Sequence, residues 1–161
     1  MGLSLSEEAD NELLFWQQLP RHIFETEIWL SPKGVSIKVA TDANDFAWGG
    51  HTLGGPLLMA REYFIWNESV ESSTFRELLG VLRCLQALVH LCIGKFVVMQ
   101  VDAQNLLGII NRGSSKLANN KLARDLFWFG LVNGITLSVE WVPREENVFA
   151  DELSKLFIPG D

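Results

Sequence analysis

Four acidic residues stand where a folded chain could bring their carboxylates together. Asp42 closes a stretch of alternating apolar and polar residues, and Asp102 directly follows a run rich in β-branched residues. Glu77 lies in the first turns of the most apolar helical stretch, and Asp151 lies at the start of the last one. Four converging carboxylates repel one another unless cations intervene, and hard divalent ions such as Mg²⁺ are bound by oxygen ligands.

Such a group of acids points to phosphodiester chemistry. Two divalent ions held about 3.5–4 Å apart can activate a water molecule and stabilise the leaving oxygen. The sequence has no Cys/His cluster with zinc spacing, no Gly-x-x-x-x-Gly-Lys phosphate loop and no recognisable nucleophile elbow. Each acid taken singly has a plainer role as a turn former, a helix cap or a solvated charge, but the four in this order favour a metal site.

The elements that must position these acids follow from sequence periodicity. Alternating or β-branched runs predict five strands, over residues 35–42, 46–53, 57–65, 96–101 and 135–142. Helical patterns predict four helices in the domain, over residues 73–91, 104–111, 117–132 and 148–156. The element order β-β-β-α-β-α-α-β-α predicts an α/β fold with a five-stranded mixed sheet and helices on both faces.

Two details of this arrangement bear on the site. Ligands gather outside the carboxyl ends of strands in open α/β sheets, so Asp42 and Asp102 can meet if their strands are neighbours. Gly80 lowers the stability of its helix by up to ~1 kcal/mol relative to Ala, which fits a helix that packs closely on the sheet.

The domain organisation follows from length and from one helix-stop signal. A chain of 161 residues suits one ordinary domain. Residues 4–19 carry the capping-box pair Ser4 and Glu7 and end before Pro20. We therefore expect an N-terminal connection helix and linker over residues 1–34 and the main domain over residues 35–161.

Composition limits the partners and the compartment. The formal net charge of −7 is unusual for a protein that binds nucleic acid, because phosphate contacts need a basic face. No apolar run reaches the ~18 residues of a membrane span. Cys84 and Cys92 would lie ~12 Å apart on one helix, too far for a disulfide, so we expect buried thiols in a reducing compartment. These features predict an intracellular protein, in the cytoplasm or nucleus, with no membrane contact and monomeric as an isolated domain.

Four sequence blocks resemble the ribonuclease H family, in the style of retroelement reverse transcriptases. They occur in the family's order and span about residues 35–156: Thr41–Asn44, Arg76–Leu79, Val101–Asp102 and Glu146–Ser154. The stretches Trp141–Asn147 and Ile109–Gly113 are especially similar to DIRS-type elements and their relatives. The N-terminal stretch resembles the connection that leads from the polymerase.

The resemblance implies a ribonuclease H-like fold and an endonuclease that cuts the RNA strand of RNA–DNA hybrids. It implies two Mg²⁺ ions, or Mn²⁺, and products with a 3′-hydroxyl and a 5′-phosphate. It also implies an adjacent reverse transcriptase polymerase, which could hold most of the hybrid and so explain the acidic charge.

The resemblance further implies roles for matched positions. The catalytic, metal-binding acids would be Asp42, Glu77, Asp102 and Asp151. Substrate contacts would come from Asn44, Ser73, Thr74 and Asn147. Ser73 and Thr74 match positions that contact the minor groove, where 2′-hydroxyls distinguish RNA from DNA. Ser73 fits an ordinary helix N-cap equally well.

Other candidate contacts with nucleic acid are basic or aromatic. One basic segment holds candidate phosphate contacts at Arg112, Lys116, Lys121 and Arg124. Lys121 and Arg124 share a helix face, although a merely solvated face explains them as well. Trp48 and Trp66 could stack on bases, but positions in the core or on a sheet face are favoured.

Two alternatives remain open. One is a junction resolvase or integrase core, which shares the acids but cuts DNA; the block Ala150–Ser154 favours ribonuclease H instead. The other is a degenerate or host-captured module that binds nucleic acid or protein, against which the intact acids argue. Cellular members of the family often have a His before the last acid, whereas this chain has none over Val142–Glu146. We therefore expect slower product release, not inactivity.

Overall fold

A five-stranded mixed sheet organises the residues that the computed structural model describes, 36–114 and 116–155. Its strands are β1 (Ser36–Ala43), β2 (Ala47–Leu53), β3 (Met59–Tyr63), β4 (Phe96–Val101) and β5 (Thr136–Trp141). They lie in the order β3-β2-β1-β4-β5. The pairs β1–β2 and β2–β3 are antiparallel, whereas β1–β4 and β4–β5 are parallel. Strands β1 and β4 are therefore neighbours whose carboxyl ends meet at the same end of the sheet.

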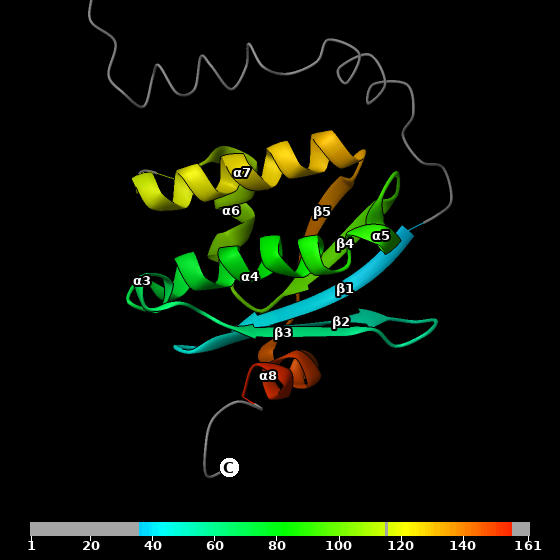
Figure 1. Cartoon of the computed structure of the whole chain (residues 1–161), viewed down its shortest axis with the longest axis horizontal. Helices are drawn as coiled ribbons and strands as arrows, with labels where there is room; N and C mark the ends of the chain where they lie inside the picture. Colours follow the sequence, from blue (N-terminus) through cyan, green and yellow to red (C-terminus); the bar gives the residue numbers. More distant parts are fainter. Residues whose placement is uncertain (1–35, 115, 156–161) are drawn as a thin grey trace, which may run out of the picture. The chain divides into compact units, whose positions relative to one another are not determined.

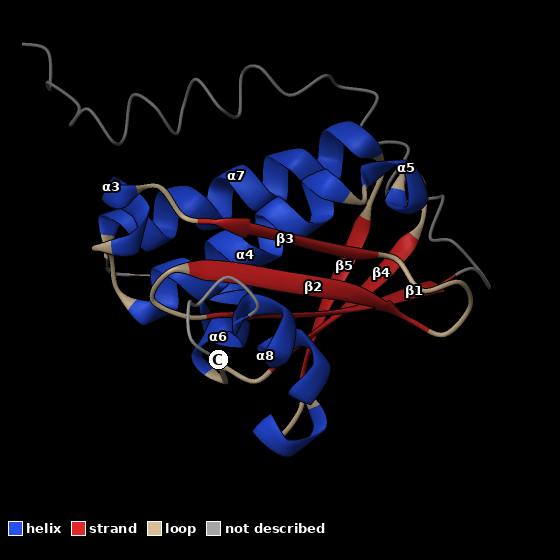
Figure 2. Cartoon of the chain, turned by 60° about the horizontal axis from the view of Figure 1, so that its bottom comes forward, coloured by secondary structure: helices blue, strands red, loops and turns tan. Residues whose placement is uncertain are grey.

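Helices cover both faces of this sheet, as the sequence predicts. Three of them lie on one face (Figure 1): α4 (Ser73–Ala87), α6 (Asn105–Arg112) and α7 (Leu117–Asn133). Helix α8 (Val148–Lys155) lies on the other face, where it packs on β2 and β1 (Figure 2). Three short elements complete the described chain: α3 (Trp66–Ser69), α5 (Val89–Cys92) and the 3-10 turn η1 (Arg144–Glu146). The predicted fold class and the order of the long elements are confirmed.

The core lies between the sheet and α4. Alternate residues of β4 are buried against this side. A Cβ atom on Gly80 would lie 3.2 Å from the Cβ of Trp48, so glycine lets α4 approach β2 closely. Trp48 is buried in the core, as favoured from the sequence. Trp66 is instead 78% exposed on α3, so a core or sheet-face position was wrong for it.

The long helix predicted over residues 73–91 is divided in the structure. The chain leaves helical geometry at Leu88, with φ −105° and ψ 19°, and resumes as α5. No glycine or proline marks this break, and Leu88 is buried, so tertiary packing decides it. Cys84 and Cys92 therefore lie on different helices, and the separation predicted from one helical rise does not apply. Both thiols are buried and free, as predicted.

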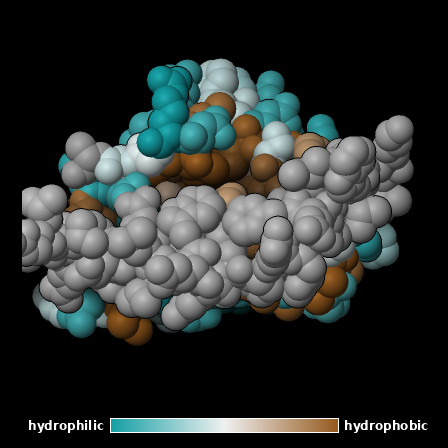
Figure 3. Space-filling model, turned by 90° about the horizontal axis from the view of Figure 1, so that it is seen from above, coloured by the Kyte–Doolittle hydropathy of each residue, from teal (hydrophilic) through white to brown (hydrophobic). Residues whose placement is uncertain are grey.

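Helix α7 exposes several apolar side chains. Leu117, Phe127 and Val132 of this helix are exposed. In the part of the α7 side that Figure 3 leaves uncovered, apolar side chains lie next to hydrophilic ones. None of the helices in the described residues is long and apolar enough to cross a membrane. The predicted N-terminal helix and the boundary between residues 34 and 35 lie outside the described residues and stay predictions.

Candidate metal centre

Three of the four predicted acids converge at the carboxyl ends of β1 and β4. Asp42, Glu77 and Asp102 each offer one carboxylate oxygen, and these oxygens lie within 4.8 Å of one another. Asp42 is the last but one residue of β1, and Asp102 follows the last residue of β4. Glu77 lies in the second turn of α4, which packs on β1. The parallel pairing of β1 with β4 thus brings the two strand-end acids together.

Hydrogen bonds hold the backbone beside these acids. The amide of Ala43 donates to Glu77 Oε1 at 3.4 Å. The indole Nε1 of Trp141, at the end of β5, donates to the main-chain carbonyl of Asp102 at 3.2 Å. Both bonds reach across from a neighbouring element, so the acids are positioned by the fold and not by flexible loops alone.

Two of the acids have strongly raised pKa values. Burial, followed by repulsion from Asp102, raises the pKa of Asp42 to about 7. Burial, followed by repulsion from Asp42, raises the pKa of Glu77 to about 10. Burial and neighbouring negative charge both disfavour the ionised form of a carboxyl group. The site therefore resists full ionisation unless a cation lies among the oxygens.

The donor set fits a hard divalent cation. All three groups offer carboxylate oxygens, which Mg²⁺, Mn²⁺ and Ca²⁺ prefer. Glu77 Oε2 is buried and has no hydrogen-bond partner among the described residues. A buried polar atom without a partner is destabilising, and coordination to a metal would satisfy it. Asp42, Glu77 and Asp102 are therefore the residues that would hold a divalent ion.

Asp151 stands at the edge of this cluster. Its Oδ2 accepts a hydrogen bond from Lys155 Nζ at 2.8 Å. Burial opposes ionisation, but the hydrogen bond with Lys155 and the positive charges of Lys155 and Arg144 hold the pKa of Asp151 below its usual range. Asp151 is thus paired with a lysine on α8 while its charge acts on Asp42.

Two predicted substrate contacts have structural partners. Asn44 Oδ1 accepts hydrogen bonds from two amides of the β1–β2 turn, at 2.8 and 2.9 Å, and its Nδ2 donates to the carbonyl of Ser154 at 2.9 Å. Asn147 is buried, and its Nδ2 donates to the carbonyl of Thr41 at 2.9 Å. These bonds tie β1 to the segment that carries Asp151. Contact of either residue with a substrate stays a prediction.

The amino-terminal end of α4 carries the other predicted pair. Ser72 is the N-cap of α4 and accepts a hydrogen bond from a first-turn amide at 3.1 Å, so the N-cap alternative for Ser73 was wrong. Ser73 is exposed. Thr74 Oγ1 accepts a hydrogen bond from Asn105 Nδ2 at 2.7 Å. The sequence analysis missed Asn105, for which the available signal was its place shortly after the acid that follows β4.

The basic segment is spread over the end of α6 and the first half of α7. Arg112, Lys116 and Lys121 are exposed, and Arg124 is half-buried. Among the described residues, none of the four forms an ion pair with a carboxylate. The amino-terminal ends of α4 and α7 lie on the same side of the view in Figure 1. Contact of these cations with phosphates stays a prediction.

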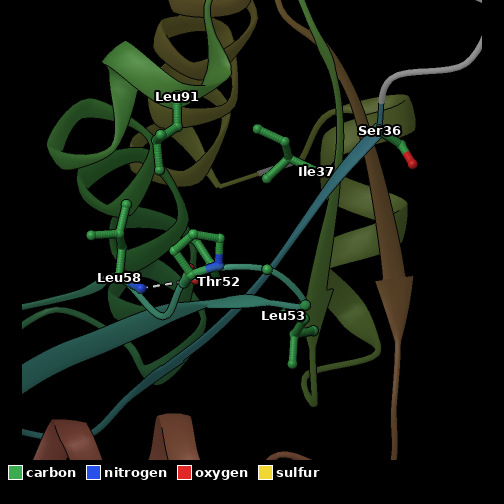
Figure 4. Close-up of a pocket in the computed structure, with 9 residues that line it drawn as sticks. Ser36, Ile37, Thr52, Leu53, Leu58 and Leu91 are labelled. Atoms are coloured by element: carbon green, nitrogen blue, oxygen red, sulfur yellow. Dashed lines mark hydrogen bonds between the residues drawn. The ribbon is translucent and has the colours of Figure 1, made fainter.

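A pocket lies at the opposite end of β1 from Asp42 (Figure 4). It has a volume of about 430 Å³ and is lined by Ser36, Ile37, Thr52, Leu53, Gly54, Gly55, Pro56, Leu58 and Leu91. The hydroxyl of Thr52 donates to the carbonyl of Pro56 and accepts from the amide of Leu58, both at 2.9 Å. No lining residue carries an acid, a base or a thiol. The acid cluster, not this pocket, is therefore the candidate site for chemistry.

Comparison with known protein families shows to which family the chain belongs. The profile of a family described as reverse transcriptase-like matches residues 60–157. The chain belongs to the reverse transcriptase-like family. The matched stretch includes Glu77, Asp102 and Asp151, while Asp42 precedes it on β1. This membership agrees with the resemblance seen in the four sequence blocks.

Solved structures with a similar fold support the architecture of this reverse transcriptase-like domain. RNase H1 from Halobacterium salinarum NRC-1 is 15% identical, with a TM-score of 0.59 over 74% of this chain and 94% of that one. LC11-RNase H1, isolated from compost and solved with an RNA/DNA hybrid, is 17% identical, with a TM-score of 0.62 over 73% and 92%. An N-terminal RNase H domain from Mycobacterium tuberculosis is 16% identical, with a TM-score of 0.59 over 74% and 91%. At such identities the likeness establishes the ribonuclease H fold. A search of curated proteins finds no match.

Proposed function

We propose that this reverse transcriptase-like domain is a metal-dependent endonuclease that hydrolyses the RNA strand of RNA–DNA hybrids. One observation carries the proposal: carboxylate oxygens of Asp42, Glu77 and Asp102 lie within 4.8 Å of one another at the ends of β1 and β4. When bound, Mg²⁺ or Mn²⁺ would supply the positive charge that activates a water and stabilises the leaving oxygen of a phosphodiester. Asp151 lies near enough to repel Asp42 electrostatically, which supports a site for two ions.

The protein's own contribution is to place and hold the acids. Asp42 belongs to the three-acid group and also lies near enough to Asp151 to be repelled by it, so it is the acid that would take part in holding both ions. Trp141 restrains the backbone at Asp102, and Asn147 restrains the backbone just before Asp42. Such restraints keep the oxygens in place before substrate arrives, which lowers the cost of reorganisation during reaction.

The start of α4 is the proposed reader of the RNA strand. The exposed Ser73 and its neighbour Thr74 lie one turn before Glu77, and Thr74 accepts a hydrogen bond from Asn105 of α6. Hydroxyl and amide groups of this kind can hydrogen-bond to 2′-hydroxyls in a shallow minor groove. The complex of LC11-RNase H1 with an RNA/DNA hybrid supports the same substrate class for this fold.

The proposed context is an intracellular retroelement reverse transcriptase. Family membership supports the link to reverse transcription. The formal net charge of −7 supports a partner that supplies positive surface, because an acidic domain alone binds phosphates weakly. We assign that role to an adjacent polymerase domain.

The experiment that tests the proposal compares labelled RNA–DNA hybrid, duplex DNA, duplex RNA and a DNA junction at low salt, with and without Mg²⁺ or Mn²⁺. We expect cleavage of the hybrid's RNA strand alone, dependent on the metal, with 3′-hydroxyl and 5′-phosphate products. Cleavage of the DNA junction would support the resolvase alternative. Metal-independent cutting, or an intact hybrid after incubation with the domain joined to its polymerase, would contradict the proposal.

A further inference from the structure

We propose that Lys155 is an internal cation that pairs with Asp151 when no metal is bound and competes with a divalent ion for this acid. This inference rests on the proposed metal site. According to this inference, the ion pair on α8 determines how tightly a second metal ion is bound.

The lysine is placed by a well-anchored helix end. Lys155 and Asp151 are four residues apart on α8, and their charged atoms lie 2.8 Å apart. The hydroxyl of Ser154 donates to the carbonyl of Asp151 at 2.7 Å, and Asn44 of the β1–β2 turn donates to the carbonyl of Ser154. The last turn of α8 is therefore fixed to the turn that follows β1.

A glycine brings this helix against the strand beside Asp42. Gly49 of β2 is the register partner of Asp42 in β1. A Cβ atom on Gly49 would lie 2.6 Å from the Cβ of Leu153 and 2.7 Å from the amide nitrogen of Ser154. Only glycine permits this approach, because both clashing groups belong to the backbone or its first side-chain atom. The ion pair is thereby held next to the acid cluster.

The ion pair ties Asp151 to Lys155 beside the acid cluster. Asp151 is paired with Lys155 and repels Asp42 electrostatically, and it lies outside the three acids whose oxygens cluster within 4.8 Å. The charge of Lys155 acts on Asp42 more weakly than on Asp151, and Arg144 is the other cation that acts on Asp151. A divalent ion between Asp42 and Asp151 would therefore meet an ammonium group already bound to one of its ligands.

The two ion positions should therefore differ in their affinity for a divalent ion. An ion among Asp42, Glu77 and Asp102 meets no paired lysine in the described structure. An ion that needs Asp151 must displace Lys155 and overcome repulsion between like charges. Removal of the lysine charge should strengthen the second position and leave the first nearly unchanged.

The test measures Mg²⁺ binding to the whole chain without substrate, by calorimetric titration and by the melting temperature in EDTA and in rising Mg²⁺. In Lys155→Gln we expect the half-saturating Mg²⁺ concentration of the weaker step to fall about three- to tenfold, as suits loss of a unit charge a few ångströms from a divalent ion. Lys155→Arg keeps the charge and should behave as wild type.

Lys38→Gln is the matched control. The Lys38 side chain is 51% exposed and pairs with Glu140 at 4.0 Å, whereas the Lys155 side chain is 49% exposed. This control removes the same charge from a similar ion pair and should leave Mg²⁺ binding unchanged. An equal gain in Lys38→Gln would overturn the inference, because the effect would then be one of net charge.

A double variant separates the inference from the proposed function. In an Asp151→Asn background, Lys155→Gln should add almost nothing, because the acid for which the lysine competes is gone. If wild type binds Mg²⁺ but Lys155→Gln binds it equally or more weakly, the inference fails alone. If wild type shows neither heat nor a melting shift with Mg²⁺, the proposed metal site fails, and the inference fails with it.

Discussion

The two ends of β1 lie in opposite chemical surroundings. At its start, Ser36 and Ile37 border an apolar pocket in which the Thr52 hydroxyl has partners for both its donor and its acceptor. At its end, Asp42 is buried among acids, and Glu77 Oε2 has no partner among the described residues. Satisfied polar groups serve packing, whereas buried charges that lack compensation indicate a site prepared for a ligand. We therefore expect function at the end of β1 that carries the acids, which is destabilised as long as no ligand is bound.

The largest expected difference between the two ends is in catalysis. Asp42→Asn keeps the shape of the side chain but removes a metal-binding charge, so hybrid cleavage should fall by several orders of magnitude while hybrid binding is largely kept. Asp151→Asn should be milder, because its place can be taken by water more easily at the edge of the cluster. Single-turnover cleavage and a separate binding assay measure both effects.

The matched variant at the other end is Leu58→Ala. Leu58 lines the pocket and is 37% exposed, so its truncation should lower the unfolding free energy by only about 1 kcal/mol and leave cleavage unchanged. A large loss of cleavage in Leu58→Ala, or full activity in Asp42→Asn, would remove the functional contrast between the ends.

The next effect is on stability as a function of pH. The folded-state pKa of Asp42 is raised from 3.8 to about 7 and that of Glu77 from 4.5 to about 10. Between these limits the folded state binds more protons than the unfolded state, so without metal the unfolding free energy should fall as pH rises. The slope is at most about 1.4 kcal/mol per pH unit for each proton. Asp151 has a lowered pKa, so it makes the unfolding free energy rise with pH. It does so only at pH values below the ordinary range of an Asp pKa.

Denaturation in EDTA at a series of pH values between about 5 and 9 checks this sign. Asp42→Asn should remove about half of the decline below about pH 7, because Glu77 still contributes there, whereas Leu58→Ala should keep all of it. Millimolar Mg²⁺ should reduce the decline, because metal binds the ionised carboxylates. A wild-type stability that is constant or rises over this range would show that the acid end is not destabilised as described.

The smallest expected effect concerns the basic segment, which belongs to neither end. If Lys121 and Arg124 each contact one phosphate, their replacement by Ala should flatten the dependence of log affinity on log salt by up to about 1.8, about 0.9 for each contact. Hybrid binding in EDTA over a range of salt concentrations measures this slope. Lys38→Ala is the control, because Lys38 pairs with Glu140 on the sheet. An unchanged slope in the double variant would place the basic face elsewhere.

Much of the candidate site could be predicted from the sequence because strand ends are visible in local patterns. The run before Asp102 and the alternation before Asp42 mark where two strands stop, and the acids follow from that. The N-cap at Ser72 was missed because neighbouring serines offer the same hydroxyl. The hydrogen bond between Thr74 and Asn105 was missed because the two residues lie on different helices and are 31 positions apart in the chain.

By itself, the sequence determined the order of the elements, the five strands and the four acids, since all of these depend on neighbours within a few residues. Only the tertiary structure decided which acids share a site. The pairing of β1 with β4 joins Asp42 to Asp102. The close approach of α8 to Gly49 brings Asp151, which is paired with Lys155, near Asp42. Such distances depend on strand order and packing between remote segments, which no local pattern of residues specifies.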